Sequence, residues 1–554
     1  MNGLMMPQQL LVSALLVHAE RHHGDQLVVS RRVEGDLHRQ SYRELAARAR
    51  RLARALDTLG LPAQATVGTL AWNGYRHLEL YYAVSGSGRV LHTINPRLHA
   101  DQLAYVVGHA QDRVLCFDLS FLPLVEALAP RLAGVRHYVL MCERACMPAA
   151  STLPDLRCYE DLVDAQDDVY AWPELDEDSA CSLCYTSGTT GDPKGVLYSH
   201  RSTLLHTMAS AWPDALNLSA RDVILPVVPM FHVNAWGLPY AACMVGARLV
   251  LPGPALDGAS LYALLEAERV TLSAGVPTVW QGLLAHVDSH DLRFTTMRRT
   301  VIGGSACPPT MLRSFQDSYD VAVIHAWGMT ELSPIGTVCQ PKTATRALER
   351  DAREALQAKQ GRAPFGVDLK IVDAAGRELP WDGRTPGELL VRGPWVMAEY
   401  LRAAGPSPVR ADARGRAWFP TGDMATIDAE GFMQITDRVK DVIKSGGEWI
   451  SSIDIENLAM AHPGVAQAAC IGVPHPKWDE RPVLLVVRRP GHALDAPELL
   501  EYLAGRIARW WTPDAVLFVD ALALGATGKV QKAQLREQHR ALLGGDAATP
   551  GSAS

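Results

Sequence analysis

The sequence predicts an α/β protein: a large N-terminal domain of βα-layered subdomains plus a β-rich subdomain, followed by a small α+β C-terminal domain. Three observations support this fold class. Short apolar segments alternate with helical patterns through about the first 330 residues, as in βαβ units with a parallel sheet. After about residue 360, strand patterns follow one another with glycine turns between them. The last 110 residues or so mix short strands with helices.

The first elements set the βα rhythm. Helical periodicity covers residues 41–60 and stops at Gly60 with Pro62 beyond it, which is typical of a helix end. Apolar strand patterns then recur about every 24 residues, with helix-like segments between them. This spacing predicts a first parallel sheet. Its strands are expected to start at Val67, Val90, Val114 and Tyr138.

A second alternating series runs from residue 180 to 328. Strands are expected at 182–186, 223–229, 247–252, 301–304 and 321–327, and helices near 234–245, 259–269, 277–287 and 308–319. A charged helix at 345–359 is expected to face solvent. The β-rich part should include strands in 368–379 and 431–438, and the C-terminal part strands at 469–473, 483–489 and 515–520 with a helix at 498–510.

Composition excludes several function classes. The chain has 554 residues, 48% apolar and 20% charged, with a formal net charge of −7, which is typical of a globular protein. A mildly acidic net charge does not indicate a broadly basic surface for nucleic acid. If the protein binds an anion, it must do so through a local cluster of basic residues or backbone amides. The ten cysteines are too sparse for a disulfide framework. Cys181 and Cys184 form a CxxC without a second pair nearby, which favours a buried structural role over a metal site.

The N-terminus shows neither a basic leader segment nor a cleavage site, and its apolar run at 10–17 is too short to span a membrane. Elsewhere no stretch reaches about 18 uncharged apolar residues. We therefore expect a soluble cytoplasmic protein.

The most informative segment is YTSGTTGDPKG at 185–195, with three glycines, four hydroxyl residues and one lysine. Glycine turns aim backbone N–H groups into a concavity that binds phosphate, and the hydroxyls and Lys194 add donors and charge. The spacing differs from that of a Walker A loop, which argues against a P-loop kinase or NTPase. The loop is expected to follow a strand and to precede a helix, as an anion-binding loop often does.

This segment resembles the phosphate loop of the adenylate-forming superfamily, which includes acyl-CoA synthetases, luciferases and the adenylation domains of peptide synthetases. Further motifs follow in the order of that superfamily, so the resemblance covers nearly the whole chain. They are GGSACP at 303–308, HAWGMTE at 325–331, TGD at 421–423, DRVKDVIKSGGEWIS at 437–451 and ATGKVQK at 526–532. The segments at 228–237 and 444–451 are similar to those of fatty acyl-CoA synthetases, and the sequence as a whole resembles the medium-chain fatty-acid–CoA ligases of bacteria.

The resemblance assigns residues to phosphate, metal and nucleotide. The phosphate-binding set is Thr186, Ser187, Gly188, Thr189, Thr190, Gly191 and Lys194. Thr186 and Glu331 are the implied ligands of Mg²⁺, a hard cation that prefers oxygen. The nucleotide-binding set is Gly304, Ser305, Ala306, His325, Ala326, Trp327, Thr330, Asp423, Arg438, Lys444 and Trp449. Trp327 replaces a tyrosine that is common in the family, which preserves stacking on adenine but removes a hydroxyl.

The acyl group is expected to lie along FHVNAW at 231–236. Relatives that activate amino acids carry an aspartate in this strip, and its absence here disfavours an amino acid substrate because a buried ammonium would lack a partner. In long-chain relatives a tryptophan at the position of Trp236 acts as a gate. The implied acyl-binding set is His232, Val233, Trp236, Gly304 and Gly328.

The resemblance also divides the chain. It implies a nucleotide- and acyl-binding domain at 1–436, a hinge at 437–441 and a small mobile domain at 442–543; composition predicts a disordered tail at 544–554. Lys440 is the implied hinge residue, and Lys529 the lysine that contacts the carboxylate and the α-phosphate. Ser445, Gly446 and Gly447 would line the path of the CoA pantetheine arm. The implied catalytic set is Lys529, Thr186, Glu331 and Lys440.

These assignments imply an ATP-dependent fatty acid–CoA ligase with Mg²⁺ as cofactor and ATP and CoA as co-substrates. The principal alternative is a CoA ligase for a short or methylthio-substituted acid, with which every motif is compatible. Luciferase-like oxidation stays open on motifs alone, whereas a noncatalytic acyl-binding protein is disfavoured because Lys529, Glu331 and the phosphate loop are all present. Fatty-acyl relatives also form homodimers, which makes a homodimer an option, and the substrate is compatible with peripheral association with the inner membrane. The resemblance leaves the length of the acyl chain open.

Overall fold

The computed structural model describes residues 1, 3–186, 192–403, 405–446, 448–525 and 530–543. The chain forms two compact units. The first unit comprises Met1–Cys307, Met311–Asp368 and Val391–Phe419, and the second comprises Pro308–Thr310, Leu369–Leu390 and the chain from Pro420 onward. The predicted domain at 1–436 with a hinge at 437–441 stays a prediction, as does the separate domain at 442–543. The tail at 544–554 lies outside the described residues.

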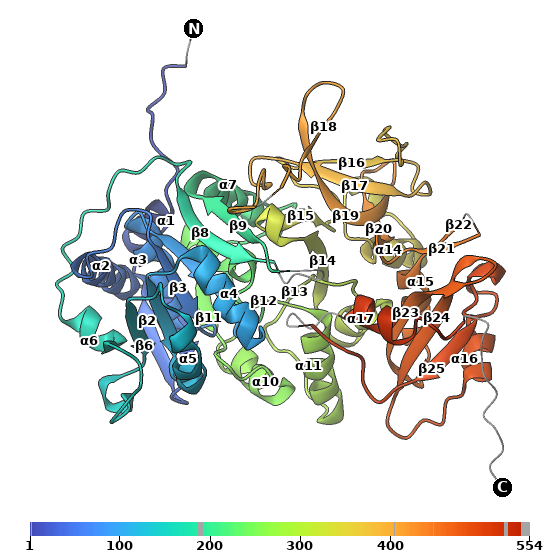
Figure 1. Ribbon diagram of the computed structural model, residues 1–554, viewed down its shortest axis with the longest axis horizontal. Coiled ribbons are helices and arrows are strands. Elements are labelled where there is room, and N and C mark those ends of the chain that lie inside the picture. Colours follow the sequence, from blue (N-terminus) through green and yellow to red (C-terminus); the bar gives the residue numbers. More distant parts are fainter. Residues whose placement is uncertain (2, 187–191, 404, 447, 526–529, 544–554) are drawn as a thin grey trace. The chain divides into compact units, whose positions relative to one another are not determined.

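The first sheet of the first unit has seven strands in the order β7-β6-β5-β3-β4-β8-β9 (Figure 1). All neighbouring pairs run parallel except β8 and β9, which form an antiparallel pair at one edge. The four strands predicted from the 24-residue rhythm are β3, β4, β5 and β6, and their parallel pairing is confirmed. The bounds are β3 (Thr66–Leu70), β4 (Val90–Thr93), β5 (Val114–Asp118), β6 (His137–Met141), β7 (Leu156–Cys158), β8 (Ala180–Tyr185) and β9 (Gly195–Ser199).

The second sheet has eight strands in the order β15-β14-β13-β12-β10-β11-β1-β2. Its interior pairs are parallel, and β15 and β2 pair antiparallel at the two edges. The prediction grouped residues 182–186 with this series, which is wrong because β8 pairs with β4 of the first sheet. The bounds are β1 (Leu27–Arg31), β2 (Leu37–Ser41), β10 (Val223–Pro226), β11 (Arg248–Leu251), β12 (Leu272–Gly275), β13 (Arg299–Ile302), β14 (Ala322–Gly328) and β15 (Ile335–Val338).

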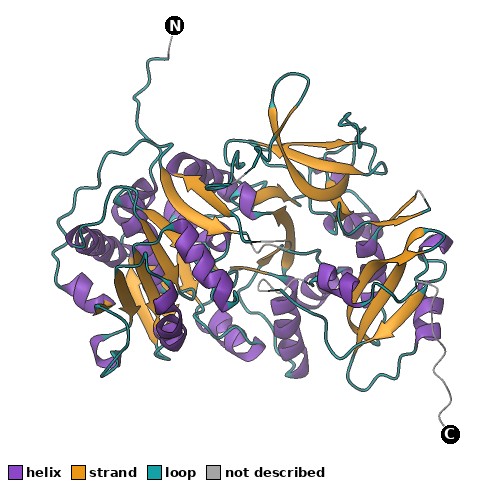
Figure 2. Cartoon of the chain, viewed as in Figure 1, coloured by secondary structure: helices purple, strands orange, loops and turns teal. Residues whose placement is uncertain are grey.

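Helices complete the layers of the first unit (Figure 2). Buried side chains of α1, α2, α3 and α9 join those of both sheets in one hydrophobic core, and α2 packs beside α3 (Figure 1). The helix predicted at 41–60 is confirmed as α2, which Ser41 and Glu44 begin with a reciprocal capping box. The bounds are α1 (Val12–His23), α2 (Tyr42–Thr58), α3 (Tyr75–Gly86), α4 (Ala100–Ala110), α5 (Leu122–Leu128), α6 (Tyr159–Asp164), α7 (His200–Ala211), α8 (Val233–Trp236), α9 (Leu238–Val245), α10 (Gly258–Ala267), α11 (Pro277–Ser289), α12 (Pro309–Arg313), α13 (Thr343–Arg346) and α14 (Arg350–Gln357).

Three helix predictions need correction. The segment 345–359 is not one helix, because α13 ends at Arg346 and α14 begins at Arg350. The segment 308–319 is regular only over α12 and continues as a π-helical turn at Ser314–Ser318. The segment 234–245 begins with a left-handed turn, so that the right-handed helix α9 starts only at Leu238.

A five-stranded sheet forms the β-rich part, with β16-β17-β19-β18 in order and β20 paired to β19. A further five-stranded sheet follows in the second unit, with β22-β21-β24-β23 in order and β25 paired to β24. The bounds are β16 (Asp368–Val372), β17 (Gly387–Arg392), β18 (Arg410–Ala411), β19 (Ala417–Ile427), β20 (Met433–Arg438), β21 (Ile443–Ser445), β22 (Glu448–Ile450), β23 (Val465–His475), β24 (Asp479–Arg488), β25 (Ala515–Phe518), α15 (Ser452–Met460), α16 (Ala496–Leu503) and α17 (Lys532–Gln538).

Side chains of the last sheet alternate between two cores, as the period of two in a strand requires. Leu484 and Val486 pack with α15 and α16 on one face, whereas Val483 and Leu485 pack with Leu535 of α17 on the other. The predicted α+β character of the C-terminal part is confirmed, although the helix predicted at 498–510 covers only Ala496–Leu503. Within the described ranges, no helix is long and apolar enough to cross a membrane.

Candidate active site

The phosphate loop connects the antiparallel strands β8 and β9, and the two residues at its ends, Thr186 and Lys194, are bonded to each other. The Thr186 amide donates to the Lys194 carbonyl at 2.9 Å, and the Lys194 amide donates to Thr186 Oγ1 at 3.2 Å. The loop follows the strand β8 as predicted, but the strand β9 stands between the loop and the next helix, α7, which begins at His200. Ser187, Gly188, Thr189, Thr190 and Gly191 lie outside the described residues.

The Thr330–Leu332 turn follows β14 and places Thr330 and Glu331 in buried positions, 6% and 7% exposed. The Tyr198 hydroxyl donates to the Thr330 carbonyl at 2.7 Å, which links this turn to β9 and hence to the end of the phosphate loop. The Tyr400 hydroxyl donates to Glu331 Oε1, also at 2.7 Å. Two tyrosines therefore hold the turn, one from an earlier part of the chain and one from a later part.

Tyr400 also reaches the phosphate loop. The Lys194 ammonium lies 5.0 Å from the centre of the Tyr400 ring, within the range of a cation–π contact. The Leu401 amide donates to the Gly195 carbonyl at 2.8 Å. The structure thus brings together the predicted residues Lys194 and Glu331 through a side chain that the sequence analysis missed. No local pattern distinguishes Tyr400 from the other tyrosines of the chain.

The donor set at this point fits a magnesium ion. Tyr400 engages Oε1 of Glu331, and a carboxylate with about four lone-pair sites can accept a proton donor and also bind a cation. Thr186 contributes a hydroxyl oxygen at the neck of the loop. Within the described ranges, no group of three His, Cys, Asp or Glu side chains could hold a metal ion. Magnesium at Glu331 would therefore complete its shell with phosphate oxygens and water, as it commonly does.

The glycine pair that follows β13 receives the predicted acyl residue Trp236. A Cβ atom on Gly303 would lie 3.2 Å from the Trp236 ring and 2.9 Å from the Ala326 carbonyl oxygen, and Gly304 has a φ of +80°. Larger residues at these positions would displace the ring or strain the backbone. Gly304 and Ser305 are exposed and Ala306 is half-buried, so the loop is accessible to a ligand.

The strip that carries Trp236 has an unusual backbone. Val233, Asn234, Ala235 and Trp236 have φ values from 46° to 58°, and Gly237 follows at 77°. Left-handed conformation costs about 1–2 kcal/mol per non-glycine residue, so tertiary contacts must compensate. The Asn234 amide supplies them, donating to Ser182 Oγ at 3.1 Å and accepting from Cys184 Sγ and from the Tyr81 hydroxyl at 3.4 Å each.

Within this strip, Val233 is buried and His232 is half-buried, with the His232 amide bonded to the Pro229 carbonyl at 3.0 Å. The prediction of a structural role for the CxxC is supported by the same network. Cys181 and Cys184 are buried in β8, and burial raises the pKa of each thiol to about 11. Both thiols therefore stay protonated and unreactive near neutral pH.

The HAWG segment forms the end of β14. His325 is 1% exposed, and its Nε2 accepts a hydrogen bond from the Cys307 amide at 3.3 Å, so the ring supports the 303–307 loop from inside the protein. Burial lowers the pKa of His325 to about 4, which keeps the ring neutral. Ala326 and Trp327 are half-buried, and the Trp327 ring leaves no room for a side chain at Gly336, where a Cβ would lie 2.2 Å away. Gly328 is required because a Cβ there would lie 2.0 Å from the Pro334 carbonyl oxygen.

The second unit brings together Asp423 and Arg438, two of the predicted nucleotide-binding residues. Asp423 and Arg438 face each other across β19 and β20, and Arg438 Nε lies 2.8 Å from Asp423 Oδ1. Asp423 is 2% exposed, while Arg438 is half-buried. The Thr421 hydroxyl accepts a hydrogen bond from the Asp423 amide at 3.1 Å, which fixes the backbone at Asp423. A carboxylate held in this way is suited to accept hydrogen bonds from a vicinal diol.

The predicted hinge residue Lys440 lies on an exposed turn, in which the amides of Asp441 and Val442 both donate to the Arg438 carbonyl. Partial burial is the main cause that lowers the pKa of Lys440 from its ordinary value, and Arg438 and Arg536 add to it. Lys444 is exposed on β21, opposite Trp449 of β22.

The predicted CoA path begins at Ser445, whose Oγ accepts from Arg481 Nη1 at 3.1 Å. Gly446 has a φ of +59°, its amide donates to the Trp478 carbonyl at 2.9 Å, and a Cβ at Gly446 would lie 2.9 Å from the Trp478 ring. The glycine is therefore needed for both conformation and space. Gly447 and Lys529 lie outside the described residues.

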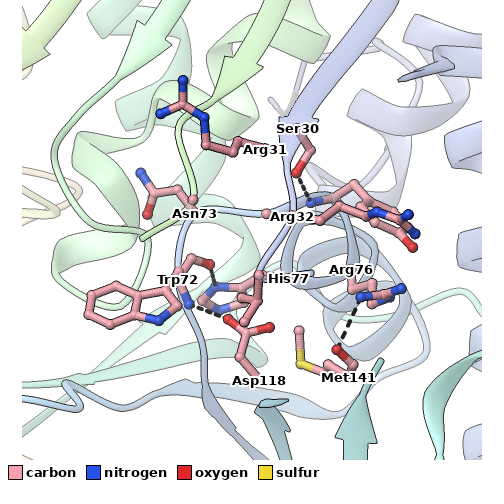
Figure 3. A pocket seen from close by; sticks show the side chains of 13 residues that line it. Ser30, Arg31, Arg32, Trp72, Asn73, Arg76, His77, Asp118 and Met141 are labelled. Atoms are coloured by element: carbon pink, nitrogen blue, oxygen red, sulfur yellow. Dashed lines mark hydrogen bonds between the residues drawn. The ribbon is translucent and has the colours of Figure 1, made fainter. Parts of the chain in front are cut away.

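A small cavity lies elsewhere in the first unit, where β1, β3 and β5 end and α3 begins (Figure 3). Its volume of about 20 Å³ holds about one water molecule, and none of the described residues that line it is a predicted site residue. Asp118 accepts from the Trp72 amide at 2.7 Å there. Burial raises the pKa of Asp118 to about 7, with Arg76 opposing and Glu34 adding to the shift.

We expect Asp118 to make the protein less stable as the pH rises. An unfolded aspartate has a pKa of about 3.9, so between about pH 4 and 7 the folded state binds more protons and the free energy of unfolding falls with rising pH, by about 4 kcal/mol at most. Asp118→Asn keeps an acceptor for the Trp72 amide and removes this titration. Urea unfolding from pH 5 to 8 should show the variant gaining on the parent protein as the pH rises, whereas parallel curves would contradict the assignment.

Comparison with known proteins gives a result that agrees with the family resemblance of the sequence motifs. The family model described as AMP-binding enzyme matches residues 16–401, and that of the AMP-binding enzyme C-terminal domain matches residues 454–529. The chain is 53% identical to the 3-methylmercaptopropionyl-CoA ligase of Ruegeria lacuscaerulensis, over 98% of this chain and 100% of that protein. It is 52% identical to the medium-chain-fatty-acid–CoA ligase of Ectopseudomonas oleovorans and 45% identical to the long-chain-fatty-acid–CoA ligase of Thermus thermophilus, over 98% of both chains in each case.

A solved structure shares the fold. ATP-bound MatB from Rhodopseudomonas palustris matches with a TM-score of 0.81 and 26% identity, over 97% of this chain and 100% of that chain. The resemblance that the sequence motifs predict is therefore confirmed at the level of family models, full-length relatives and fold. The chain belongs to the AMP-binding enzyme family.

Proposed function

We propose that this protein is an ATP-dependent fatty acid–CoA ligase. In the first step the fatty acid carboxylate attacks the α-phosphate of ATP, which forms acyl-AMP and releases pyrophosphate. In the second step the CoA thiol attacks the acyl carbonyl, which forms the thioester and releases AMP. The observation that carries the proposal is the convergence of Thr186, Lys194 and Glu331, from motifs more than 130 residues apart, at one place in the first unit.

The proposed chemistry needs no side-chain nucleophile. Magnesium bound through Glu331 and Thr186 would neutralise charge on the phosphates, and the loop with Lys194 would hold their oxygens. Asp423 and Arg438 would bind the ribose, and Lys529 would hold the carboxylate against the α-phosphate. Catalysis would then consist of positioning and of preorganised charge stabilisation.

We further propose that the two steps use two arrangements of the chain. The hinge at 437–441, with Lys440 as pivot, would turn the domain at 442–543 against the domain at 1–436. One arrangement would present Lys529 for adenylation, and the other would present Ser445, Gly446 and Gly447 to the pantetheine arm. Alternation of this kind lets each reaction have its own complete site.

For the acid we propose a medium-chain fatty acid. The strip at 231–236 has no carboxylate for an ammonium group, and Trp236 packs against the glycines at 303–304, which gives the acyl side an apolar wall. A short methylthio-substituted acid is the second candidate, because the relative at 53% identity is named for such a substrate and the medium-chain relative follows at 52%. The homodimer and peripheral association with the inner membrane stay predictions of the family resemblance.

The test is AMP release by the purified protein with ATP, Mg²⁺ and CoA, for acids from C4 to C18 and for 3-methylthiopropionate. We expect the highest kcat/KM between about C6 and C12. One missing methylene in an apolar pocket costs about 10-fold or more, so the series should show a clear optimum. A maximum at 3-methylthiopropionate would replace the medium-chain assignment by the second candidate. ADP as product, or no nucleotide product with any acid, would refute the ligase.

A further inference from the structure

Tyr400 lies between two opposite charges that the proposed function assigns to the same ligand. Its hydroxyl donates to Glu331 Oε1 at 2.7 Å, and the Lys194 ammonium lies 5.0 Å from the centre of its ring. Within the described ranges the Lys194 ammonium forms no ion pair with a carboxylate. The Tyr400 side chain thus contacts both charged groups, one through its hydroxyl and the other through its ring.

The backbone on both sides of Tyr400 is fixed to the elements that carry these charges. The Met397 amide donates to the Glu331 carbonyl and the Leu401 amide to the Gly195 carbonyl, both at 2.8 Å. Arg402 donates to the His109 carbonyl and, at 2.9 Å, to Gln111 Oε1 at the end of α4. The segment 397–402 therefore connects the turn after β14, the start of β9 and the end of α4.

The two ends of the Tyr400 side chain act on the two charges in different ways. The Tyr400 hydroxyl donates to the Glu331 carboxylate at 2.7 Å. That bond fixes the orientation of Glu331. The electron-rich ring face attracts the ammonium without neutralising it, because a cation–π contact leaves the charge in place.

We propose that Tyr400 is a positioning residue that keeps Lys194 and Glu331 apart and aimed at Mg·ATP. A direct pair of these two groups would satisfy both charges internally and leave less attraction for a magnesium ion and for phosphate. With Tyr400 in place, the carboxylate can serve the cation and the ammonium can serve the phosphates. The inference rests on the proposed function, since it assumes that this site binds Mg·ATP.

The hydroxyl and the ring can be separated by substitution. Tyr400→Phe keeps the ring under Lys194 and removes the hydrogen bond to Glu331. Tyr400→Leu removes both contacts and permits the direct pair. The matched control is Tyr159→Phe, because the buried Tyr159 hydroxyl donates to Glu79 Oε2 at the same 2.7 Å, away from the predicted site residues.

The test is calorimetric binding of Mg·ATP, and of AMP without metal, to the full-length protein. We expect Tyr400→Phe to weaken Mg·ATP binding about 10- to 100-fold, the effect of losing one hydrogen bond to a charged group, and to leave AMP binding within about twofold. Tyr400→Leu should weaken Mg·ATP binding further. Tyr159→Phe should bind both ligands like the parent protein, and thermal unfolding of each variant reports its fold.

Each outcome decides the proposal. Parent-like Mg·ATP binding by both Tyr400 variants would overturn it, and so would an equal loss of Mg·ATP and AMP binding, which indicates general damage. An effect of Tyr159→Phe as large as that of Tyr400→Phe would also overturn it. Failure of the proposed function appears separately, as absence of Mg·ATP binding by the parent protein or of AMP release with every acid.

Discussion

Replacing Lys529 by alanine is expected to slow adenylation by about 10²–10³-fold, the usual cost of removing one preorganised donor from a developing negative charge. The lysine belongs to the ATGKVQK motif, where the family resemblance places the group that contacts the carboxylate and the α-phosphate. In the second step the adenylyl group has already been transferred to the carboxylate, and the thiol attacks the acyl carbonyl and displaces AMP. The second step should therefore keep its rate.

The two half-reactions can be measured separately. Fatty-acid-dependent exchange of pyrophosphate into ATP reports adenylation, and thioester formation from supplied acyl-AMP and CoA reports the second step. Lys477→Ala is the control for adenylation, because Lys477 is an exposed lysine of the second unit and lies outside the implied catalytic set. Equal loss in both half-reactions of Lys529→Ala would contradict the role assigned to this lysine.

The sequence predicts the parallel strands well because their signal is local. Each of β3, β4, β5 and β6 is a short apolar run bounded by helical or turn segments. Such a run is the usual sequence pattern of a parallel strand that is buried on both faces. β9 shows the limit of this reasoning. Its five residues become a strand because they pair antiparallel with β8 across the phosphate loop, and that pairing depends on a partner strand.

The left-handed turn at 233–237 could not be predicted from local preference. Valine, alanine and tryptophan rarely adopt positive φ, so the apolar run is more typical of a helix. The turn persists because Asn234 bonds to Ser182 and Cys184, about 50 residues earlier in the chain. Tertiary contacts of this kind outweigh propensity and have no signature within the segment.

The site shows the same division between local and distant information. The resemblance names Asp423 and Arg438 together, and the register of β19 and β20 does place them face to face. Tyr400 has no motif of its own, and its contact with Glu331 spans 69 positions. Its part in the site becomes visible only when the turn after β14 and the segment 397–402 are seen side by side.

Replacing Lys440 by proline is expected to have the reverse effect of Lys529→Ala. Proline fixes φ near −65°, and in a backbone that cannot adopt this value it costs about 3 kcal/mol. If that cost falls on only one of two domain arrangements, the step that uses that arrangement slows by about 10²-fold. We expect the thioester step to be the slowed one, with adenylation retained.

The turn around Lys440 makes the substitution selective. Its backbone hydrogen bonds are donated by Val439 to Gly422 and by Asp441 and Val442 to Arg438, so proline at position 440 removes none of these three bonds. Lys440→Ala is the matched control, because it deletes the same side chain and leaves φ free. Pyrophosphate exchange and thioester formation from acyl-AMP are again compared for the two variants. If Lys440→Pro forms the thioester as fast as Lys440→Ala, the pivot lies elsewhere in the chain.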